Sequence, residues 1–256
     1  SDKWKELREK GTKPKLVCFY MFASPYSSAP IKAIKDQAKL LGIEVEKDQD
    51  VSLTALDAKS QVLAAKETGA NVVWHGNTAM SVATAIKDAY ALKFEADHLT
   101  NNWGLDKNLV RITGKAGEGT IGAASCAFFE MDYPMLDKVR EYAKKVNPGV
   151  SEDKRDIRTV QGWLKVSLAV AGLGIADKQG KLDGPAIKAA LESLRDWYPF
   201  NTKNALGVGP YTITDKDHRP TPVATLYTIK DEKIVLFDKV DMKEKFPQEW
   251  PKWLGW

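Results

Sequence analysis

The chain has 256 residues, of which 43% are hydrophobic and 28% charged, and a formal net charge of +4 from 38 basic and 34 acidic side chains. This composition is typical of a globular protein with one large domain or two smaller lobes. The charge is weak and the lysines are scattered, which argues against a nucleic-acid partner. We see no apolar run of the roughly 18 residues that a membrane span needs, and residues 1–11 are charged rather than signal-like.

Few residues carry the chemistry of a metal site or an enzyme. Cys18 and Cys126 lie in apolar, strand-like surroundings, which favours buried free thiols over a disulfide. His75, His98 and His218 are far apart in the sequence and lack ligand spacing, so we expect no metal. The motifs GxGxxG, GxxxxGK[ST] and GxSxG do not occur. We therefore expect a protein without a cofactor that is not an enzyme.

The first half of the chain alternates between short strands and helices. Apolar runs indicate strands at 15–22, 43–46, 71–76, 97–100 and 119–125. Helical spacing indicates helices at 2–10, 30–41, 56–68, 81–92 and 105–112, with Ser28 as the expected cap and Pro30 as the first residue of the second helix. This alternation predicts an α/β fold with a doubly wound parallel sheet.

After Cys126 the pattern changes to helices with little strand between them. Helical stretches cover 133–146, 157–176 and 185–197, and residues 224–237 form a predicted hairpin that turns at Asp231-Glu232. In the second of these helices one apolar face is expected, made by Val160, Leu164, Leu168, Ala171 and Ile175.

Polar and aromatic side chains follow the predicted strands where each strand ends. Ser24 and Tyr26 follow the first strand, Asn77 and Thr78 a second, and Asn102-Trp103 a third. Since the carboxyl ends of parallel strands share one edge, we expect one concave surface there, with helix N–H groups pointing into it. Uncharged hydroxyls, amides and rings suit binding of a small molecule better than catalysis.

His75 stands at the end of the second of these strands and has two interpretations. A lone histidine beside an apolar strand is most often structural, and no acidic partner stands beside it in the sequence. Its functional alternative is a hydrogen-bond donor to a ligand carboxylate or carbonyl group.

Several segments together resemble one known family. The segments "KPKLVCFYMFASPYSSAPIKAIKDQAKLLGIEV", "LAAKETGANVVW", "TNNWG", "AGEGTIGA", "VQGW" and "DKDHRPTPVATLYTIKDEKIV" occur in the same order in substrate-binding proteins of branched-chain amino acid-type ABC importers. The resemblance implies a type I periplasmic binding protein fold, in which two lobes joined by three hinge strands close on a ligand. It also implies a periplasmic or other extracytoplasmic location, with a lipid anchor as one form of attachment, and a membrane permease as partner.

The resemblance also implies how the lobes divide. Residues 1–126 and 218–256 match the family's second lobe, and residues 127–217 match a segment that returns to the first lobe. Most of the first lobe precedes the strand at 15–22 in the family, so we expect it to be missing here. A second copy of the chain, or a separate N-terminal fragment, would then cover the helix at 157–176.

By position in the family, Tyr26, Thr78 and the run Asn101-Asn102-Trp103 match ligand contacts of the second lobe, and Trp163 matches an aromatic contact of the first. Amino-acid binders of the family usually carry a carboxylate near the third strand end, where this chain has Asn101-Asn102-Trp103. An unpaired ammonium is costly to bury. An amide, an aromatic or aliphatic carboxylate, or another small organic solute therefore fits at least as well as an amino acid, and we expect weak or no binding of leucine, isoleucine and valine.

Two other functions use similar folds. The first alternative is the ligand-sensing core of a regulator or receptor, which a DNA-binding or membrane segment elsewhere in the protein would favour. The second is an enzyme on a flavodoxin-like sheet, for which the sequence offers neither a nucleophile paired with a base nor a phosphate-binding loop.

Overall fold

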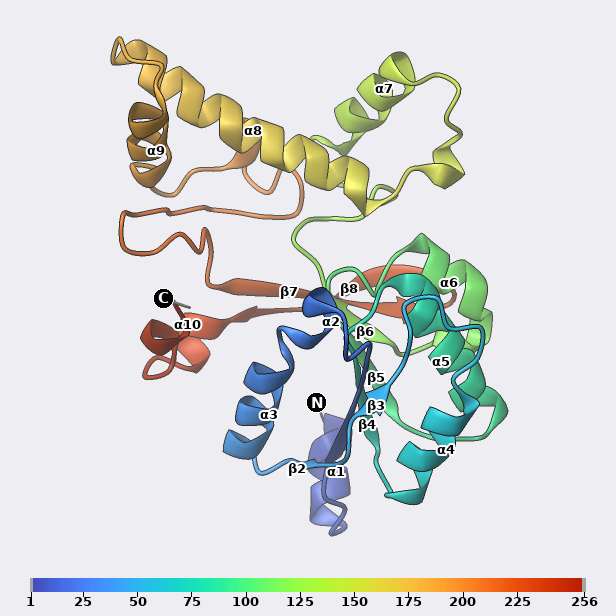
Figure 1. The fold of residues 1–256 in the computed structure, drawn as a ribbon. Coiled ribbons are helices and arrows are strands. Elements are labelled where there is room, and N and C mark those ends of the chain that lie inside the picture. The colour runs from blue at the N-terminus through green and yellow to red at the C-terminus, as the bar shows by residue number, and fades with distance from the viewer. Residues whose placement is uncertain (1, 255–256) are drawn as a thin grey trace. The chain divides into compact units, whose positions relative to one another are not determined.

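The computed structural model describes residues 2–254 and contains one mostly parallel sheet (Figure 1). Its eight strands are β1 (Lys15–Tyr20), β2 (Glu44–Val45), β3 (Gln49–Asp50), β4 (Val72–His75), β5 (Asp97–Thr100), β6 (Ile121–Ala123), β7 (Val223–Lys230) and β8 (Lys233–Asp241). They are ordered β2-β1-β4-β5-β6-β7-β8, and β3 also pairs with β1. Strands β1 to β6 pair in parallel and β7 joins antiparallel to β6. The predicted α/β fold class is confirmed.

The chain divides into two compact units. Unit 1 contains the residues up to Ala124 together with Leu226–Phe237, and unit 2 contains Ser125–Thr225 and the residues from Asp238 onward. The resemblance instead implied that residues 218–256 group with residues 1–126. Residues 238–254 belong with unit 2 because Arg219 donates to the Trp250 carbonyl at 2.9 Å and its guanidinium lies 3.6 Å from the centre of the Trp250 ring. That the units are the two lobes of a receptor stays a prediction.

Unit 1 has helices on both faces of its sheet. Its helices are α1 (Asp2–Glu9), α2 (Pro25–Ser28), α3 (Ile31–Leu40), α4 (Lys59–Glu67), α5 (Ala79–Ala91) and α6 (Lys107–Thr113). Alternate residues of β1 point to opposite faces: Val17 and Phe19 pack in the core under α4 and α5, whereas Leu16 and Cys18 pack with α3. Figure 1 shows α3 on one side of the sheet and α4, α5 and α6 on the other. This is the doubly wound arrangement that the alternating pattern predicted.

The turn after β1 differs from the prediction. Ser24, rather than Ser28, caps a helix: its hydroxyl accepts the Ser27 N–H at 3.3 Å, and Pro25 is the first residue of α2. Helix α3 follows after Pro30, without a side-chain cap. Both Ser24-Pro25 and Ser28-Ala29-Pro30 carry a cap residue and a proline, and only the first spacing places the proline at the first helical position.

Unit 2 consists mainly of helices. They are α7 (Leu136–Val146), α8 (Ile157–Lys178), α9 (Gly184–Glu192) and α10 (Met242–Lys245). Helices α8 and α9 approach closely at Gly172, where an added Cβ would lie 2.8 Å from the Leu191 side chain. The apolar face predicted for α8 is therefore covered within this unit: Val160 and Leu164 are buried, and Leu168, Ala171 and Ile175 are half-buried.

A second apolar stripe of α8 is exposed. Val166 and Val170 are 61% and 59% exposed, and Leu173 is 43% exposed. Because α8 is apolar nearly all round, a single face could not be assigned from the sequence. By length and composition α8 is also long and apolar enough to span a membrane, which the sequence analysis did not expect. Of its most apolar 18-residue stretch, 28% is buried within the protein. Core helices of globular proteins pass the same test, so this is weak evidence for a membrane.

Candidate functional site

Three loops meet at the carboxyl-terminal edge of the sheet in unit 1. They are the β1 loop (residues 21–24), the β4 loop (residues 76–78) and the β5 loop (residues 101–106). Parallel pairing of β1 with β4 and of β4 with β5 brings the ends of these strands side by side, with Phe19 opposite His75 and His75 opposite Thr100. We call these loops, together with α2 and the first turn of α5, the carboxyl edge. It carries six of the seven residues predicted to bind a ligand: Ser24, Tyr26, Asn77, Thr78, Asn102 and Trp103.

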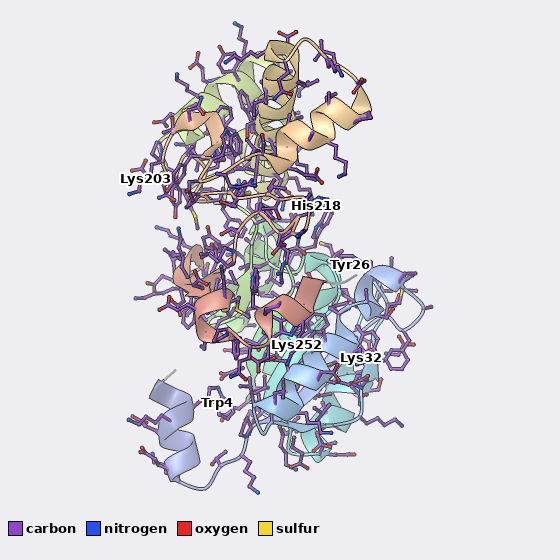
Figure 2. The ribbon with its side chains drawn as sticks, turned by 90° about the vertical axis from the view of Figure 1, so that its left-hand side faces the viewer. Trp4, Tyr26, Lys32, Lys203, His218 and Lys252 are labelled. Carbon is purple, nitrogen blue, oxygen red and sulfur yellow. The ribbon has the colours of Figure 1, made fainter. Side chains whose placement is uncertain are left out.

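Tyr26 and Trp103 form an aromatic pair at the carboxyl edge. Their ring centres lie 6.4 Å apart in an edge-on arrangement, and each residue is 41% exposed. Burial of the remaining part raises the pKa of Tyr26, against a hydrogen bond from Asn101 that lowers it, so the phenol is neutral near pH 7. Figure 2 labels Tyr26 at this end of unit 1 and Trp4 at the other. An exposed aromatic pair of this kind can cover the apolar part of a small molecule.

The hydroxyls at this edge differ in their availability. Ser24 already accepts the Ser27 N–H as a helix cap. Thr78 occupies the cap position of α5 in extended conformation, and its side chain makes no capping hydrogen bond. Thr78 is therefore the better candidate for a polar contact to a solute.

Asn77 was predicted to line the surface of the site, but it is buried beneath it. It is only 2% exposed, and its Oδ1 accepts the Met21 N–H at 3.0 Å. Its Nδ2 donates to the Val51 carbonyl at 2.8 Å and to Ser81 Oγ at 2.9 Å. An amide with all of these partners holds the loops together, and it cannot contact a ligand without breaking them.

At least one of the helix N–H groups that were expected to face a ligand already donates a hydrogen bond within the protein. The first N–H of α5, from Ala79, donates to the Trp103 carbonyl at 3.0 Å. The β5 loop thus satisfies one of the groups that a helix start leaves unpaired. The Ala79 N–H is therefore not available to a ligand.

His75 is a buried structural histidine. It is 2% exposed, and its Nε2 lies 2.9 Å from His98 Nδ1, although the sequence analysis judged the histidines to be far apart. Burial lowers the pKa of His75 well below its usual value, with His98 adding to the effect, and burial lowers the pKa of His98 to about 4. Strand pairing of β4 with β5 brings the two rings together. No group of three metal-ligating side chains occurs among residues 2–254.

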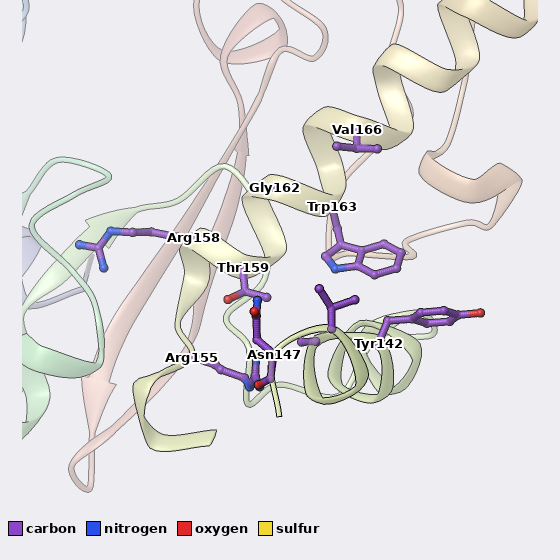
Figure 3. Close-up of a pocket in the computed structure, with 10 residues that line it drawn as sticks. Tyr142, Asn147, Arg155, Arg158, Thr159, Gly162, Trp163 and Val166 are labelled. Atoms are coloured by element: carbon purple, nitrogen blue, oxygen red, sulfur yellow. The ribbon is translucent and has the colours of Figure 1, made fainter. Parts of the chain in front are cut away.

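Trp163, the seventh predicted residue, lies in unit 2 on α8. It lines a cavity of about 430 Å³ between α7 and α8, shown in Figure 3. Its ring is 5.8 Å from that of Tyr142 and 6.0 Å from that of Phe200. The buried Arg155 closes one side, and its guanidinium donates to the carbonyls of Asn147 and Val150 at 2.6 and 2.9 Å. This cavity is lined mainly by apolar groups.

Sequence reasoning missed two exposed apolar residues of the carboxyl edge. Phe22 is 48% exposed and Met80 is 57% exposed. Phe22 ends the apolar run predicted as a strand at 15–22, two residues after the end of β1, and Met80 lies in the first turn of α5, just before the helix predicted at 81–92. Their place after a strand end and at a helix start was the signal that would have identified them.

Comparisons with known proteins agree with this architecture. Residues 5–233 match the family described as periplasmic binding protein. A search of curated proteins found no match. Among solved structures, a branched chain amino acid ABC transporter from Thermus thermophilus with bound valine is 20% identical with a TM-score of 0.81, and the alignment covers 96% of this chain and 66% of that one.

Two further structures are similar. A substrate binding protein of an ABC transporter from Aeropyrum pernix is 25% identical with a TM-score of 0.77, over 93% of this chain and 62% of that one. A fatty acid ABC transporter substrate-binding protein from Thermomonospora curvata is 22% identical with a TM-score of 0.76, over 94% and 61%. The chain thus spans less than two thirds of each protein's length. Because the family match covers most of the chain, this protein belongs to the periplasmic binding protein family.

Proposed function

We propose that this chain is part of a non-catalytic solute receptor that delivers a small organic molecule to the permease of an ABC importer outside the cytoplasm. The observation that carries the proposal is the half-exposed pair of Tyr26 and Trp103 beside the hydroxyl of Thr78, at the carboxyl edge of a parallel sheet. In open α/β sheets this edge is where ligands bind. The family match and the transport proteins of similar fold support the same role. Ligand closure between two lobes, and a contribution from Trp163, stay predictions.

The chemistry of the edge favours a solute without an ammonium group. The β1, β4 and β5 loops present aromatic rings, hydroxyls and amides, and their one carboxylate, Asp106, is 2% exposed and accepts the Asn108 and Leu109 N–H groups. A ligand ammonium would find no free carboxylate within these three loops, since the nearby Asp50 of β3 already accepts the Phe22 N–H at 2.9 Å, and an ammonium removed from water without a counter-charge is costly. We therefore propose an amide, or an aromatic or aliphatic carboxylate, as the ligand class. Solved structures of the same fold carry the names of a valine-bound and a fatty acid transporter, so both chemistries belong in the test.

Isothermal titration calorimetry with a defined solute panel tests this proposal. The panel contains leucine and valine, their neutral amides without the amino group, benzoate and octanoate. We expect at least one solute without an ammonium group to bind, and leucine and valine to bind weakly or not at all. Micromolar binding of leucine would overturn the assigned ligand class, and no binding of any solute by the chain would contradict the assigned site.

A further inference from the structure

Asn101 connects the β4 and β5 loops at the carboxyl edge. Its Nδ2 donates to the Gly76 carbonyl at 2.8 Å, and its Oδ1 accepts the Trp103 N–H at 2.9 Å. Both ends of the amide are therefore engaged with backbone groups of two different loops. The two hydrogen bonds together give the β5 loop one preferred position.

The side chain of Asn101 also interacts with both residues of the aromatic pair, Tyr26 and Trp103. It lies close enough to the Tyr26 hydroxyl to lower the pKa of that phenol, and its Oδ1 accepts the Trp103 N–H. Trp103 in turn accepts the Ala79 N–H, so the β5 loop is fixed to the start of α5 as well. Asn101 therefore connects the two members of the Tyr26–Trp103 pair.

The path of the β5 loop leaves little room for another arrangement. A Cβ at Gly104 would lie 1.5 Å from Thr100 Oγ1, so the loop lies directly on the end of β5. Gly104 N–H also donates to the Asn101 carbonyl at 3.1 Å, which closes a tight turn around Trp103. A loop packed this closely can hold Trp103 half-exposed, provided that its backbone hydrogen bonds are kept.

We propose that Asn101 is a positioning residue, which orients Tyr26 and Trp103 for solute binding without touching the solute. The inference rests on the proposed function for its purpose, and on the hydrogen bonds above for its mechanism. This proposal gives the two adjacent asparagines, Asn101 and Asn102, different roles. Asn101 directs its amide to the backbone and is half-buried, whereas Asn102 is exposed and follows it in the same loop.

The chain contains a matched control at the opposite edge of the same sheet. Asn71 accepts the Lys15 N–H with Oδ1 at 2.8 Å and donates to the Lys13 carbonyl with Nδ2 at 3.1 Å. It therefore makes the same kind of amide bridge between two backbone groups. Replacing Asn71 removes the same number of hydrogen bonds at the end of the strands that lies away from Trp103.

The test compares Asn101→Ala with Asn71→Ala in the whole chain labelled with 5-fluorotryptophan. The ¹⁹F resonance of Trp103 is assigned by its loss in Trp103→Phe, since the chain has eight tryptophans. We expect Asn101→Ala to shift and broaden the Trp103 resonance, and Asn71→Ala to leave it unchanged at a similar loss of stability. An unchanged Trp103 resonance in folded Asn101→Ala would overturn the inference.

A second readout uses valine, benzoate and octanoate as calorimetric probes. For any probe that the wild type binds, we expect Asn101→Ala to weaken binding about tenfold, which corresponds to ~1.4 kcal/mol, and Asn71→Ala to keep the wild-type affinity. Equal affinity of the wild type and Asn101→Ala would contradict the positioning role. If the wild type binds no probe, the proposed function fails, and the ¹⁹F comparison still decides whether Asn101 fixes the aromatic pair.

Discussion

The two units of this protein bury their apolar residues in different ways. Unit 1 places helices on both faces of a parallel sheet, so that Val17 and Phe19 on one face and Cys18 on the other are all buried. Unit 2 is mainly helical, and its longest helix, α8, buries one side while Val166 and Val170 remain exposed. The comparison shows that unit 1 has a self-contained core, whereas unit 2 presents apolar surface that its own residues do not cover.

The largest expected effect comes from the core of unit 1. Phe19 is 2% exposed and packs with Val17 and Val73. Phe19→Ala removes this packing and leaves a cavity, which should lower the free energy of unfolding by about 3–5 kcal/mol. Urea denaturation followed by circular dichroism measures the change. A loss below about 1 kcal/mol would mean that unit 1 does not have the core described here.

Acid should destabilise unit 1 more than unit 2. His75 and His98 are held neutral in the folded state, while the unfolded chain takes up protons near pH 6.5. Stability that is present above pH 6.5 is therefore lost as the pH falls toward about 4, at ~1.4 kcal/mol per pH unit for one proton. Unit 2 contains only His218, which is exposed and lies 2.8 Å from Glu192.

Urea unfolding of wild type and His98→Gln between pH 7 and pH 5 tests this difference, because a glutamine amide can still hydrogen-bond to His75 without titrating. We expect the wild type to lose stability over this range and His98→Gln to lose distinctly less. Identical pH dependence of the two proteins would refute the assignment.

Glu118 should stabilise the hairpin that completes the sheet of unit 1. Its carboxylate accepts the Asp231 and Glu232 N–H groups at 3.0 and 2.7 Å, across more than a hundred residues of sequence. Asp231 and Glu232 have φ of 52° and 55°, which non-glycine residues adopt reluctantly. Glu118→Ala should cost about 1–2 kcal/mol and speed amide exchange at the β7–β8 turn. Unchanged exchange at this turn would argue against the clamp.

The smallest change in stability is expected on the exposed stripe of α8. Val166→Ser and Val170→Ser alter exposed side chains, so each should change the free energy of unfolding by less than about 0.5 kcal/mol. An apolar stripe of this kind favours association, so light scattering should show the wild type to be partly associated and the double variant monomeric. A wild type that stays monomeric at high concentration would show that the stripe needs no partner.

Much of the fold was predictable because its signals are local. Strand β1, the hairpin around Asp231-Glu232 and the start of α8 at Ile157 follow directly from an apolar run, turn residues and a capping aspartate, respectively. Features that depend on contacts between residues distant in the sequence could not be predicted. The contact of His75 with His98, the attachment of the C-terminal segment to Arg219 and the Glu118 clamp all join residues separated by more than twenty positions.

The candidate site shows the same division. The carboxyl edge could be predicted, because parallel strands place their loops together. The role of each asparagine could not, because Asn77, Asn101 and Asn102 differ only in their neighbours in space. Structure makes Asn77 a buried bridge and leaves Asn102 exposed.

Native mass spectrometry tests most directly whether the carboxyl edge of unit 1 holds a small organic solute. The chain is purified without denaturation, its mass is compared with the 28.4 kDa of the polypeptide, and any released molecule is identified. We predict one noncovalent small-molecule adduct that Trp103→Ala loses and Asn71→Ala keeps. An adduct that persists in folded Trp103→Ala, or a wild type that carries none and binds none of the calorimetric probes, would contradict the account.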